Sequence, residues 1–194
     1  MDRINKEQEI IKIIFKDFLT LYNSRSISKL IGLTHAGAFK ILKKLEKRNI
    51  VKAKRIGNTV VYSLEMENPV TLREIEMILT IEAQNYRRWI EEFIDIKVKV
   101  KFVILFGSII RNEKEAKDID LLIVSENNKL KEIQKIINKK NELLNKKIHP
   151  LLQTPKDFKN DIKNKNKVMI EILKTGVVLF GQEEISKIIA ELNE

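Results

Sequence analysis

The sequence has no cysteine, few prolines and no long apolar run. Without cysteine, the 194-residue chain has no disulfide, no thiolate metal site and no cysteine nucleophile. Its three prolines and 43% hydrophobic residues indicate a folded chain. No stretch reaches the roughly 20 apolar residues of a membrane span, and the charges scattered through residues 1–21 are unlike a signal peptide. We therefore expect a cytoplasmic protein with no membrane partner.

Positive charge is concentrated in two parts of the chain. The formal net charge is +10. Lys and Arg outnumber Asp and Glu by 14 to 7 in residues 1–68 and by 20 to 14 in residues 97–194, whereas acids lead by 6 to 3 in residues 69–96. This charge suits a polyanion, although lysine-rich surfaces also occur on proteins that bind none. The length permits two small cores, and we take these three ranges as domain, connector and domain.

Residues 1–68 predict three helices with a tight turn before the third. An apolar stripe at helical spacing in residues 7–22 indicates a helix that packs in a core. Ser26 is the expected N-cap of a short second helix that ends at Gly32, and Thr34 is the expected cap of the next. Two helices joined by so short a turn are typical of a helix-turn-helix.

The third predicted helix has a basic outer face. Its inward residues are Ala38, Ile41, Leu42 and Leu45, with Phe39 at their border. Its outward residues are Ala36, Gly37, Lys40, Lys43, Lys44 and Lys47. Small residues at the start of such a helix let the backbone approach a base edge, and the lysines that follow would meet phosphates. His35, beside the cap, would contact a base or remain a solvated histidine.

Two alternating runs around Gly57-Asn58 predict a β-hairpin over residues 50–64. The polar side chains expected on its surface are Lys52, Lys54, Arg55 and Asn58. Three helices and a basic hairpin in this order resemble the winged helix-turn-helix DNA-binding domains of prokaryotic regulators, over roughly residues 5–66. The resemblance implies double-stranded DNA as a partner. The alternative is a small helical module that binds a protein and has a solvated lysine face.

Residues 71–96 predict one amphipathic helix. Its apolar stripe consists of Leu72, Ile75, Leu79, Ala83, Tyr86, Ile90 and Phe93. The stripe would pack against the two flanking domains or against its copy in a second subunit. Because a regulator with one recognition helix per chain usually needs two chains to span a two-fold operator, we expect a homodimer, with this helix as the candidate interface.

A strand, a Gly-Ser pair and two aspartates mark the last domain. Residues 98–106 predict a strand that leads into Gly107-Ser108, where a short helix is expected. Glycine lets a phosphate approach the backbone, serine can cap the helix, and free amides at a helix start attract anions. Asp118 and Asp120 follow on a second strand and would point to one face. Two such carboxylates suit Mg²⁺ on nucleotide phosphates, or else belong to an exposed turn.

The motif resembles the nucleotidyltransferase superfamily that includes DNA polymerase beta and the minimal nucleotidyltransferases. Gly107, Ser108, Asp118 and Asp120 match it position by position, and the resemblance covers residues 98–181. It implies a mixed sheet flanked by helices, Mg²⁺ and a nucleoside triphosphate. Together with residues 1–68 this gives an α/β (α+β) chain: an N-terminal winged helix-turn-helix, a connecting helix and a C-terminal nucleotidyltransferase fold.

The resemblance also implies a third carboxylate on a neighbouring strand, which we expect at residues 147–153. That segment, KIHPLLQ, has no acid. His149 stands near the position expected for that carboxylate. It would act there as a base or a metal ligand, or it would only shape the strand before Pro150. The nearest acids, Glu142 and Asp157, fall on predicted flanking helices.

Three functions remain open. The first is a DNA-binding transcriptional regulator whose nucleotidyltransferase domain is degenerate or senses nucleotide or metal. The second is an active, magnesium-dependent enzyme that moves AMP onto a partner protein, as an antitoxin would, and regulates its own gene through DNA binding. The third is an RNA-processing transferase. The missing third carboxylate favours the first.

Overall fold

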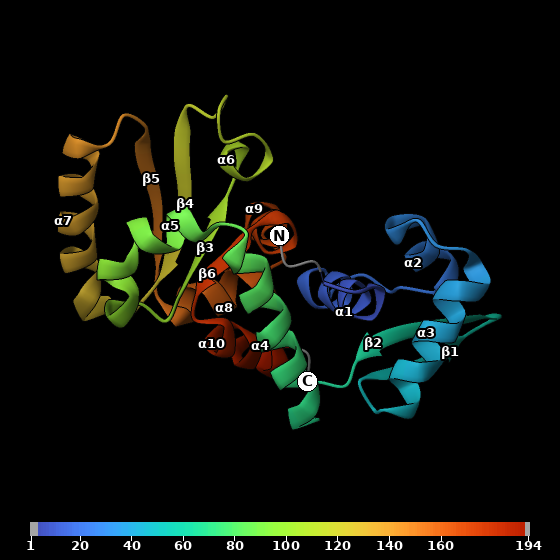
Figure 1. Cartoon of the computed structure of the whole chain (residues 1–194). Helices are drawn as coiled ribbons and strands as arrows, with labels where there is room; N and C mark the ends of the chain where they lie inside the picture. Colours follow the sequence, from blue (N-terminus) through green and yellow to red (C-terminus); the bar gives the residue numbers. More distant parts are fainter. Residues whose placement is uncertain (1–3, 193–194) are drawn as a thin grey trace.

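Three helices and a β-hairpin form the N-terminal part of the chain. In the computed structural model, which describes residues 4–192, they are α1 (Lys6–Lys16), α2 (Ser24–Ile31), α3 (His35–Lys47), β1 (Val51–Ile56) and β2 (Thr59–Leu64) (Figure 1). We call residues 4–68 the head. The helices and strands of the head follow the predicted order.

Capping residues fix the turn between α2 and α3. Asn23 caps α2 and forms a capping box with Ser26, so the predicted cap at Ser26 is wrong. Gly32 ends α2 at φ 65°, a left-handed conformation that glycine adopts without a steric penalty. The Thr34 hydroxyl accepts a hydrogen bond from the Gly37 amide (3.1 Å) and caps α3 as predicted.

One face of α3 packs onto the rest of the head. Its buried residues are Ala38, Leu42 and Leu45, as the sequence predicts. The hairpin turns at Gly57, where φ is 57°. The amide of Tyr62 in β2 donates to the carbonyl of Tyr22 (2.7 Å), so the segment between α1 and α2 lies against the hairpin. The opposite face of α3 is exposed to solvent.

The connector is three short segments, so the single predicted helix over residues 71–96 is wrong. The segments are α4 (Pro69–Gln84), α5 (Arg87–Glu92) and the 3₁₀ helix η1 (Ile94–Lys99). Asn85 ends α4, and Trp89 and Phe93 of the following turns are buried and stack at 6.2 Å between ring centroids. The chain therefore bends after α4 to bury these rings on the C-terminal sheet.

The apolar stripe of α4 is buried inside its own chain. Ile75, Ile78 and Leu79 are almost fully buried, and α4 packs against α1 of the head. On its other side α4 contacts two C-terminal elements described next, β6 and α10. This face is therefore occupied within the chain, which agrees with the first of the two alternatives, packing against the flanking domains, and leaves the stripe unavailable as a subunit interface.

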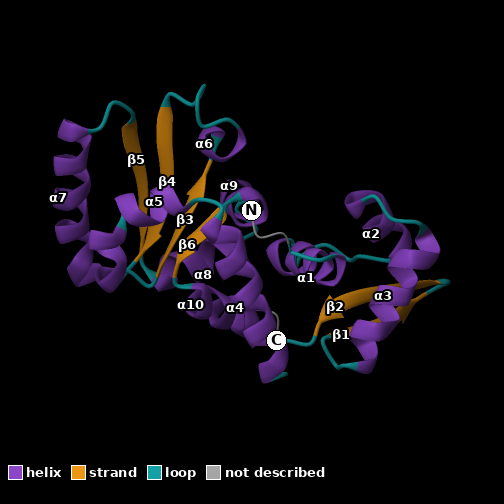
Figure 2. Cartoon of the chain, in the orientation of Figure 1, coloured by secondary structure: helices purple, strands orange, loops and turns teal. Residues whose placement is uncertain are grey.

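A four-stranded mixed sheet with helices on both faces forms the C-terminal part (Figure 2). Its strands are β3 (Phe102–Phe106), β4 (Asp118–Val124), β5 (Lys147–Gln153) and β6 (Val177–Phe180). Its helices are α6 (Ser108–Arg111), α7 (Asn127–Leu143), α8 (Pro155–Lys163), α9 (Lys167–Thr175) and α10 (Gln182–Leu192). We call residues 97–192 the body. The mixed α+β class is confirmed.

The strands are ordered β5-β4-β3-β6. β4 runs parallel to β5 and antiparallel to β3, which in turn runs antiparallel to β6. Leu122 and Val124 of β4 pack on the face covered by α8, α9 and α10, whereas Leu121 and Ile123 pack on the face covered by α5, η1 and α7. Asp118 and Asp120 alternate with Ile119, so they lie on the α8–α10 face, at the end where β4 begins.

One apolar core extends from the head into the body. Ile10 and Leu45 of the head belong to the same buried cluster as Phe102 and Ile185 of the body, with α4 between them. The head is thus held by packing as well as by the chain that links it. No helix within residues 4–192 is long and apolar enough to cross a bilayer.

Buried charges reinforce this junction. The Lys16 ammonium donates to Glu82 of α4 (2.6 Å) and to the carbonyl of Gly176, which precedes β6 (2.6 Å). Burial lowers the pKa of Lys16, and Glu82 opposes that shift. Each of these bonds joins the end of α1 to an element far away in the sequence.

A second group of polar contacts, centred on Asp17, lies beside the Lys16–Glu82 pair. Asp17 pairs with Lys174 of α9 (2.8 Å) and accepts a hydrogen bond from the Tyr22 hydroxyl (2.6 Å). Burial pushes the pKa of Asp17 upward, but its hydrogen bonds with Lys174, Tyr22 and Thr20 outweigh burial and hold it below its usual range. The carboxylate is therefore ionised and ties α1 to α9.

Candidate functional site

β3 and β4 bring Gly107 against the Asp120 carboxylate. Phe106, the last residue of β3, pairs with Asp120 in antiparallel register. Gly107 follows at φ 80° and ψ −150°, a conformation essentially restricted to glycine. A β-carbon here would overlap Oδ2 of Asp120 and lie 3.1 Å from its Cγ. Both the backbone and the adjacent carboxylate therefore require glycine.

The two aspartates share one face of β4, as predicted from their spacing. Both are half-buried. Burial raises the pKa of the Asp120 carboxyl; His149 acts against this rise, and the charge of Asp118 adds to it. A cation placed beside these carboxylates would relieve their repulsion and favour the ionised form of Asp120.

His149 is the neighbour of Asp120 on β5. The two residues pair in the parallel register of β4 and β5, and Nδ1 of His149 lies 3.8 Å from Oδ1 of Asp120. The histidine ring is mostly exposed. The chain thus places an imidazole where the superfamily resemblance implies a third carboxylate.

The other acids considered from the sequence do not reach this site. Asp157 is held in the capping box of α8, where it accepts hydrogen bonds from Thr154. Glu142 is exposed near the end of α7. Among residues 4–192, no group of three or more His, Asp or Glu side chains is placed to hold a metal ion. The residues present suit a single Mg²⁺ on Asp118 and Asp120 better than a pair of metals.

Ser108 does not cap a helix. It is the first residue of α6, which is a single turn whose cap position is Gly107 and which has no side-chain cap bond. The predicted capping role of Ser108 is therefore wrong, and its hydroxyl is exposed. Because one turn has little macrodipole, the predicted attraction of an anion to this helix start is weak, and the hydroxyl itself becomes the relevant donor.

A groove of about 440 Å³ adjoins Gly107, between α6 and α9. Its lining residues are Phe106, Gly107, Ile110, Arg111, Lys167, Val168, Glu171, Ile172 and Thr175. The lining is largely apolar, and two cations flank it, Arg111 on α6 and Lys167 on α9. Within the described residues neither cation has a carboxylate partner within ion-pair distance. The sequence did not predict this groove, because only the fold brings the two helices together.

The outward face of α3 is cationic, as predicted. Its centre is formed by Lys40, Lys43 and Lys47, which are exposed. Lys43 pairs within the helix with Glu46 (2.7 Å), and its ammonium lies 5.9 Å from the centre of the Phe39 ring. Exposed pairs of this kind contribute little free energy and exchange readily with other anions. The face is therefore available to a polyanion.

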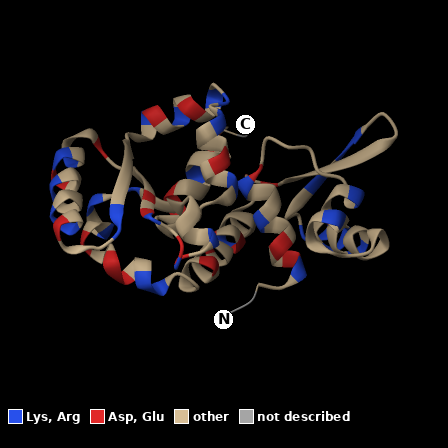
Figure 3. Ribbon diagram, turned by 90° about the horizontal axis from the view of Figure 1, so that it is seen from above, with Lys and Arg blue, Asp and Glu red and all other residues tan. Residues whose placement is uncertain are grey.

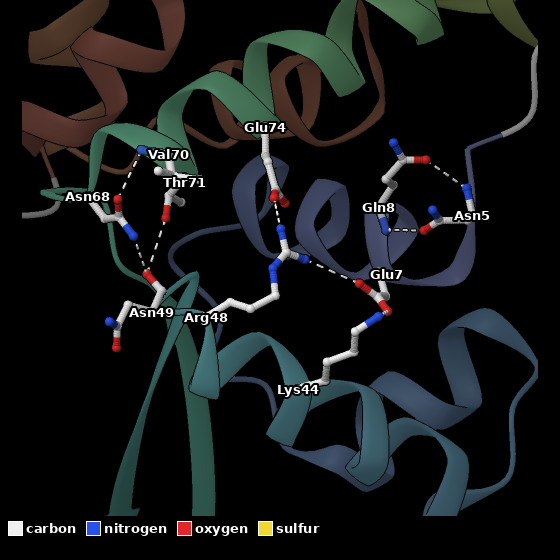
Figure 4. Close-up of polar contacts among 10 residues, drawn as sticks. All are labelled: Asn5, Glu7, Gln8, Lys44, Arg48, Asn49, Asn68, Val70, Thr71 and Glu74. Atoms are coloured by element: carbon white, nitrogen blue, oxygen red, sulfur yellow. Dashed lines mark hydrogen bonds and ion pairs between the residues drawn. The ribbon is translucent and has the colours of Figure 1, made fainter.

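Lys44 lies at the border of that face. It forms an ion pair with Glu7 of α1, and Arg48 bridges Glu7 (3.3 Å) and Glu74 of α4 (Figure 4). These pairs hold the end of α3 against α1 and α4. Lys44, predicted as a DNA contact, thus has a partner within the chain.

The start of α3 carries the small and polar residues named from the sequence. Ala36 is exposed, Gly37 is half-buried under the Thr34 cap, and the His35 ring shares a hydrogen bond with the Ser24 hydroxyl (2.7 Å). The His35 ring is thus held at the surface by α2.

The hairpin presents further polar groups. Lys54 and Asn58 are exposed, Lys52 lies 3.5 Å from Glu65, and Arg55 donates to the carbonyl of Gly57 (3.1 Å). Figure 3 shows Lys and Arg gathered on the head and again on α7 at the opposite end of the molecule. Cations are thus present at both ends, as the charge count indicated.

The sequence matches a family model described as polymerase beta, nucleotidyltransferase, over residues 89–185. The chain belongs to this nucleotidyltransferase family. No curated protein matches it.

Solved structures of Lactococcus lactis ZitR are similar to part of this chain. A double mutant of ZitR shares 17% identity over 48% of this chain and 64% of the ZitR chain, with a TM-score of 0.36. The match therefore spans less than two thirds of that ZitR chain. A single-residue mutant of ZitR shares 14% identity over 73% of this chain and 75% of its own, with a TM-score of 0.37.

Family membership places the Gly-Ser and Asp-x-Asp residues in one nucleotidyltransferase domain. The structure brings Gly107, Asp118, Asp120 and His149 to one end of the sheet, with Ser108 next to them. Sequence reasoning missed Arg111 and Lys167. The only local signal for Lys167 was the basic loop KNKNK before an apolar helix.

Proposed function

We propose that this protein is a DNA-binding transcriptional regulator whose nucleotidyltransferase body binds a magnesium nucleotide as a sensor. The observation that carries the proposal is the exposed cationic face of α3, with Lys40, Lys43 and Lys47 in one row. The capped turn before α3 and the hairpin after it occur in the order expected of a winged helix-turn-helix, a fold that presents such a helix to the major groove.

The hairpin is placed to support this contact. Lys54, Arg55 and Asn58 lie at or near its tip. In winged-helix proteins a tip of this kind meets phosphates or the minor groove, whereas the start of the recognition helix, here Thr34 to Gly37, meets base edges. The head would thus read duplex DNA and not single strands.

The body would hold the nucleotide. Asp118 and Asp120 would ligate Mg²⁺, and Gly107 would let the phosphates approach the backbone beside Ser108. The ion would neutralise phosphate charge. Because β5 supplies His149 in place of a third carboxylate, the site fits binding better than transfer.

Replacing Lys40, Lys43 and Lys47 together with alanine should weaken duplex binding across all sequences. The slope of log affinity against log salt should fall by roughly 0.9 for each phosphate that the variant no longer neutralises. Fluorescence anisotropy with duplexes from the region upstream of its own gene, at several salt concentrations, measures both quantities.

The matched control for that experiment is the triple alanine variant of Lys131, Lys135 and Lys139. These lysines are exposed on α7, and their removal changes the net charge by the same amount. Equal losses for the two triple variants would mean that net charge alone drives binding, and the proposed face of α3 would be wrong. Lys44→Ala should lose less affinity than Lys40→Ala, because Lys44 lies at the border of that face, beside Glu7 of α1.

A homodimer is part of this proposal, since one chain has one such helix and a two-fold operator needs two. The buried stripe of α4 is excluded as its interface. The subunits would meet through another surface, or would meet only on DNA.

The second candidate is an active enzyme that transfers AMP to a partner protein. It is favoured by Asp118 and Asp120, which share one face of β4 as the transfer chemistry of this family requires. If it is correct, α-labelled ATP with Mg²⁺ should label a protein encoded beside it, and Asp118→Asn or Asp120→Asn should abolish labelling.

The control is Asp95→Asn, an exposed carboxylate on η1 outside the site. Labelling that persists in both site variants would show that the transfer is not performed by this site. If the protein binds the four nucleoside triphosphates but labels nothing with any of them, the enzyme is excluded and the sensor is the candidate that remains.

A further inference from the structure

The groove between α6 and α9 has the size and lining of a small-molecule site. Its volume of about 440 Å³ falls in the range of roughly 300–1,000 Å³ that such sites occupy. Phe106, Ile110, Val168 and Ile172 supply apolar surface, and Gly107 brings the groove to the candidate phosphate site. A nucleobase, which is flat and has apolar faces, suits this lining.

Charge favours an anionic occupant. Arg111 and Lys167 line the groove from opposite helices, with no ion pair to either among residues 4–192. Glu171 is the one carboxylate among the lining residues of the described chain. A nucleoside carrying phosphates matches this combination, since it offers an apolar ring and several negative charges.

α9 connects the groove to the head. Thr175, at the end of α9, lines the groove and also a second cleft of about 330 Å³ at the junction of head and body. In that cleft Lys174 pairs with Asp17 (2.8 Å), and Lys16 donates to the Gly176 carbonyl (2.6 Å). One end of α1 is thus bonded to the end of the helix that forms a wall of the groove.

From α1 the contacts continue to α3. Glu7 on α1 pairs with Lys44 and Arg48, which lie near the end of α3 (Figure 4). α1 and α3 also pack directly. A shift of α9 would therefore move α1, and with it the face that the proposed function places on DNA.

We propose that the groove between α6 and α9 is an effector site for the nucleoside part of a nucleoside triphosphate, and that α9 links its occupancy to the DNA affinity of the head. This inference rests on the proposed function. By linkage, a nucleotide that changes the affinity for DNA must have its own affinity changed by DNA by the same factor.

The groove is tested with a fluorescent N-methylanthraniloyl derivative of ATP and Mg²⁺. Val168→Glu should weaken binding about tenfold or more, because it places a negative charge on an apolar wall near the phosphates. Val168 is 63% exposed, so the variant should fold. The control is Val98→Glu, the same change at an 88% exposed residue outside the groove. Equal affinities of the two variants would overturn the groove as the site.

The linkage is tested by measuring duplex affinity with and without Mg-ATP, and Mg-ATP affinity with and without duplex. We expect reciprocal changes of roughly 5- to 150-fold. Lys174→Met, which removes the pair with Asp17 but leaves the bond from Lys16 to the Gly176 carbonyl, should keep both separate affinities and reduce the coupling. The control variant Lys187→Met removes an exposed pair with Glu183 on α10 (2.7 Å) and should leave the coupling unchanged.

The outcomes separate this inference from the proposed function. Duplex binding that is identical with and without bound nucleotide overturns the linkage but leaves the regulator intact. Coupling that is undiminished in Lys174→Met overturns the pair between Lys174 and Asp17 as the link between α9 and α1. A wild-type protein that binds no duplex at low salt contradicts the proposed function itself, and the Val168→Glu comparison still decides the groove.

Discussion

Replacing Glu82 with alanine should lower the free energy of unfolding by about 3–5 kcal/mol, the usual result of removing one partner of a buried ion pair. Glu82 exposes 14% of its side chain and Lys16 exposes 8%. The variant leaves the Lys16 ammonium buried, with the Gly176 carbonyl as its one remaining acceptor among residues 4–192. Chemical denaturation at neutral pH measures the loss.

Two further variants make that result interpretable. The double variant Lys16→Met/Glu82→Leu should recover most of the stability, because neither charge of this pair is then left buried without the other. Glu91→Ala breaks the exposed pair with Arg87 (2.8 Å) on α5 and should change stability by no more than about 1 kcal/mol. A similar small loss for Glu82→Ala would show that the junction is hydrated and contributes little.

Replacing Gly107 with alanine should remove Mg-ATP binding and destabilise the fold by about 1–3 kcal/mol. The stability loss comes from the backbone at φ 80° and ψ −150°, which disfavours any side chain. The loss of binding comes from the overlap of the new methyl group with the Asp120 carboxylate, which must move. Titration with fluorescent ATP and urea unfolding measure the two effects.

A double-mutant cycle with Asp120→Ala separates strain from overlap. If the methyl group acts on the carboxylate, Gly107→Ala should destabilise the Asp120→Ala background less than the wild type, and the two changes will not add. Additive losses would mean that the backbone alone accounts for the effect. Normal Mg-ATP binding by Gly107→Ala would contradict the proposed position of the phosphates.

Local patterns in the sequence predicted much of this structure. The α3 cap at Thr34, the Gly32 ending and the Gly57 turn depend on residues a few positions apart, so they can be found without the fold. The placement of Asp118 and Asp120 on the same face of β4 follows from the two-residue period of a strand. Those predictions were confirmed because the physics that fixes them is short-range.

The rest depended on contacts between distant segments. The apolar spacing continues past Asn85, so no local pattern indicates that α4 ends there; the bend follows from burying Trp89 and Phe93 on the sheet. Lys16 and Gly176 are 160 positions apart, and nothing near either predicts the other. The groove between α6 and α9 arises in the same way, from helices that are separate in sequence and adjacent in the fold.

Pro150 affects how copies of this molecule can associate. It lies in the middle of β5, the outermost strand on one side of the sheet, and it has no N–H to offer to an incoming strand. The outermost strand on the other side, β6, is four residues long and is packed by α4 and α5. We therefore expect lengthening of the sheet from molecule to molecule to be hindered at both margins.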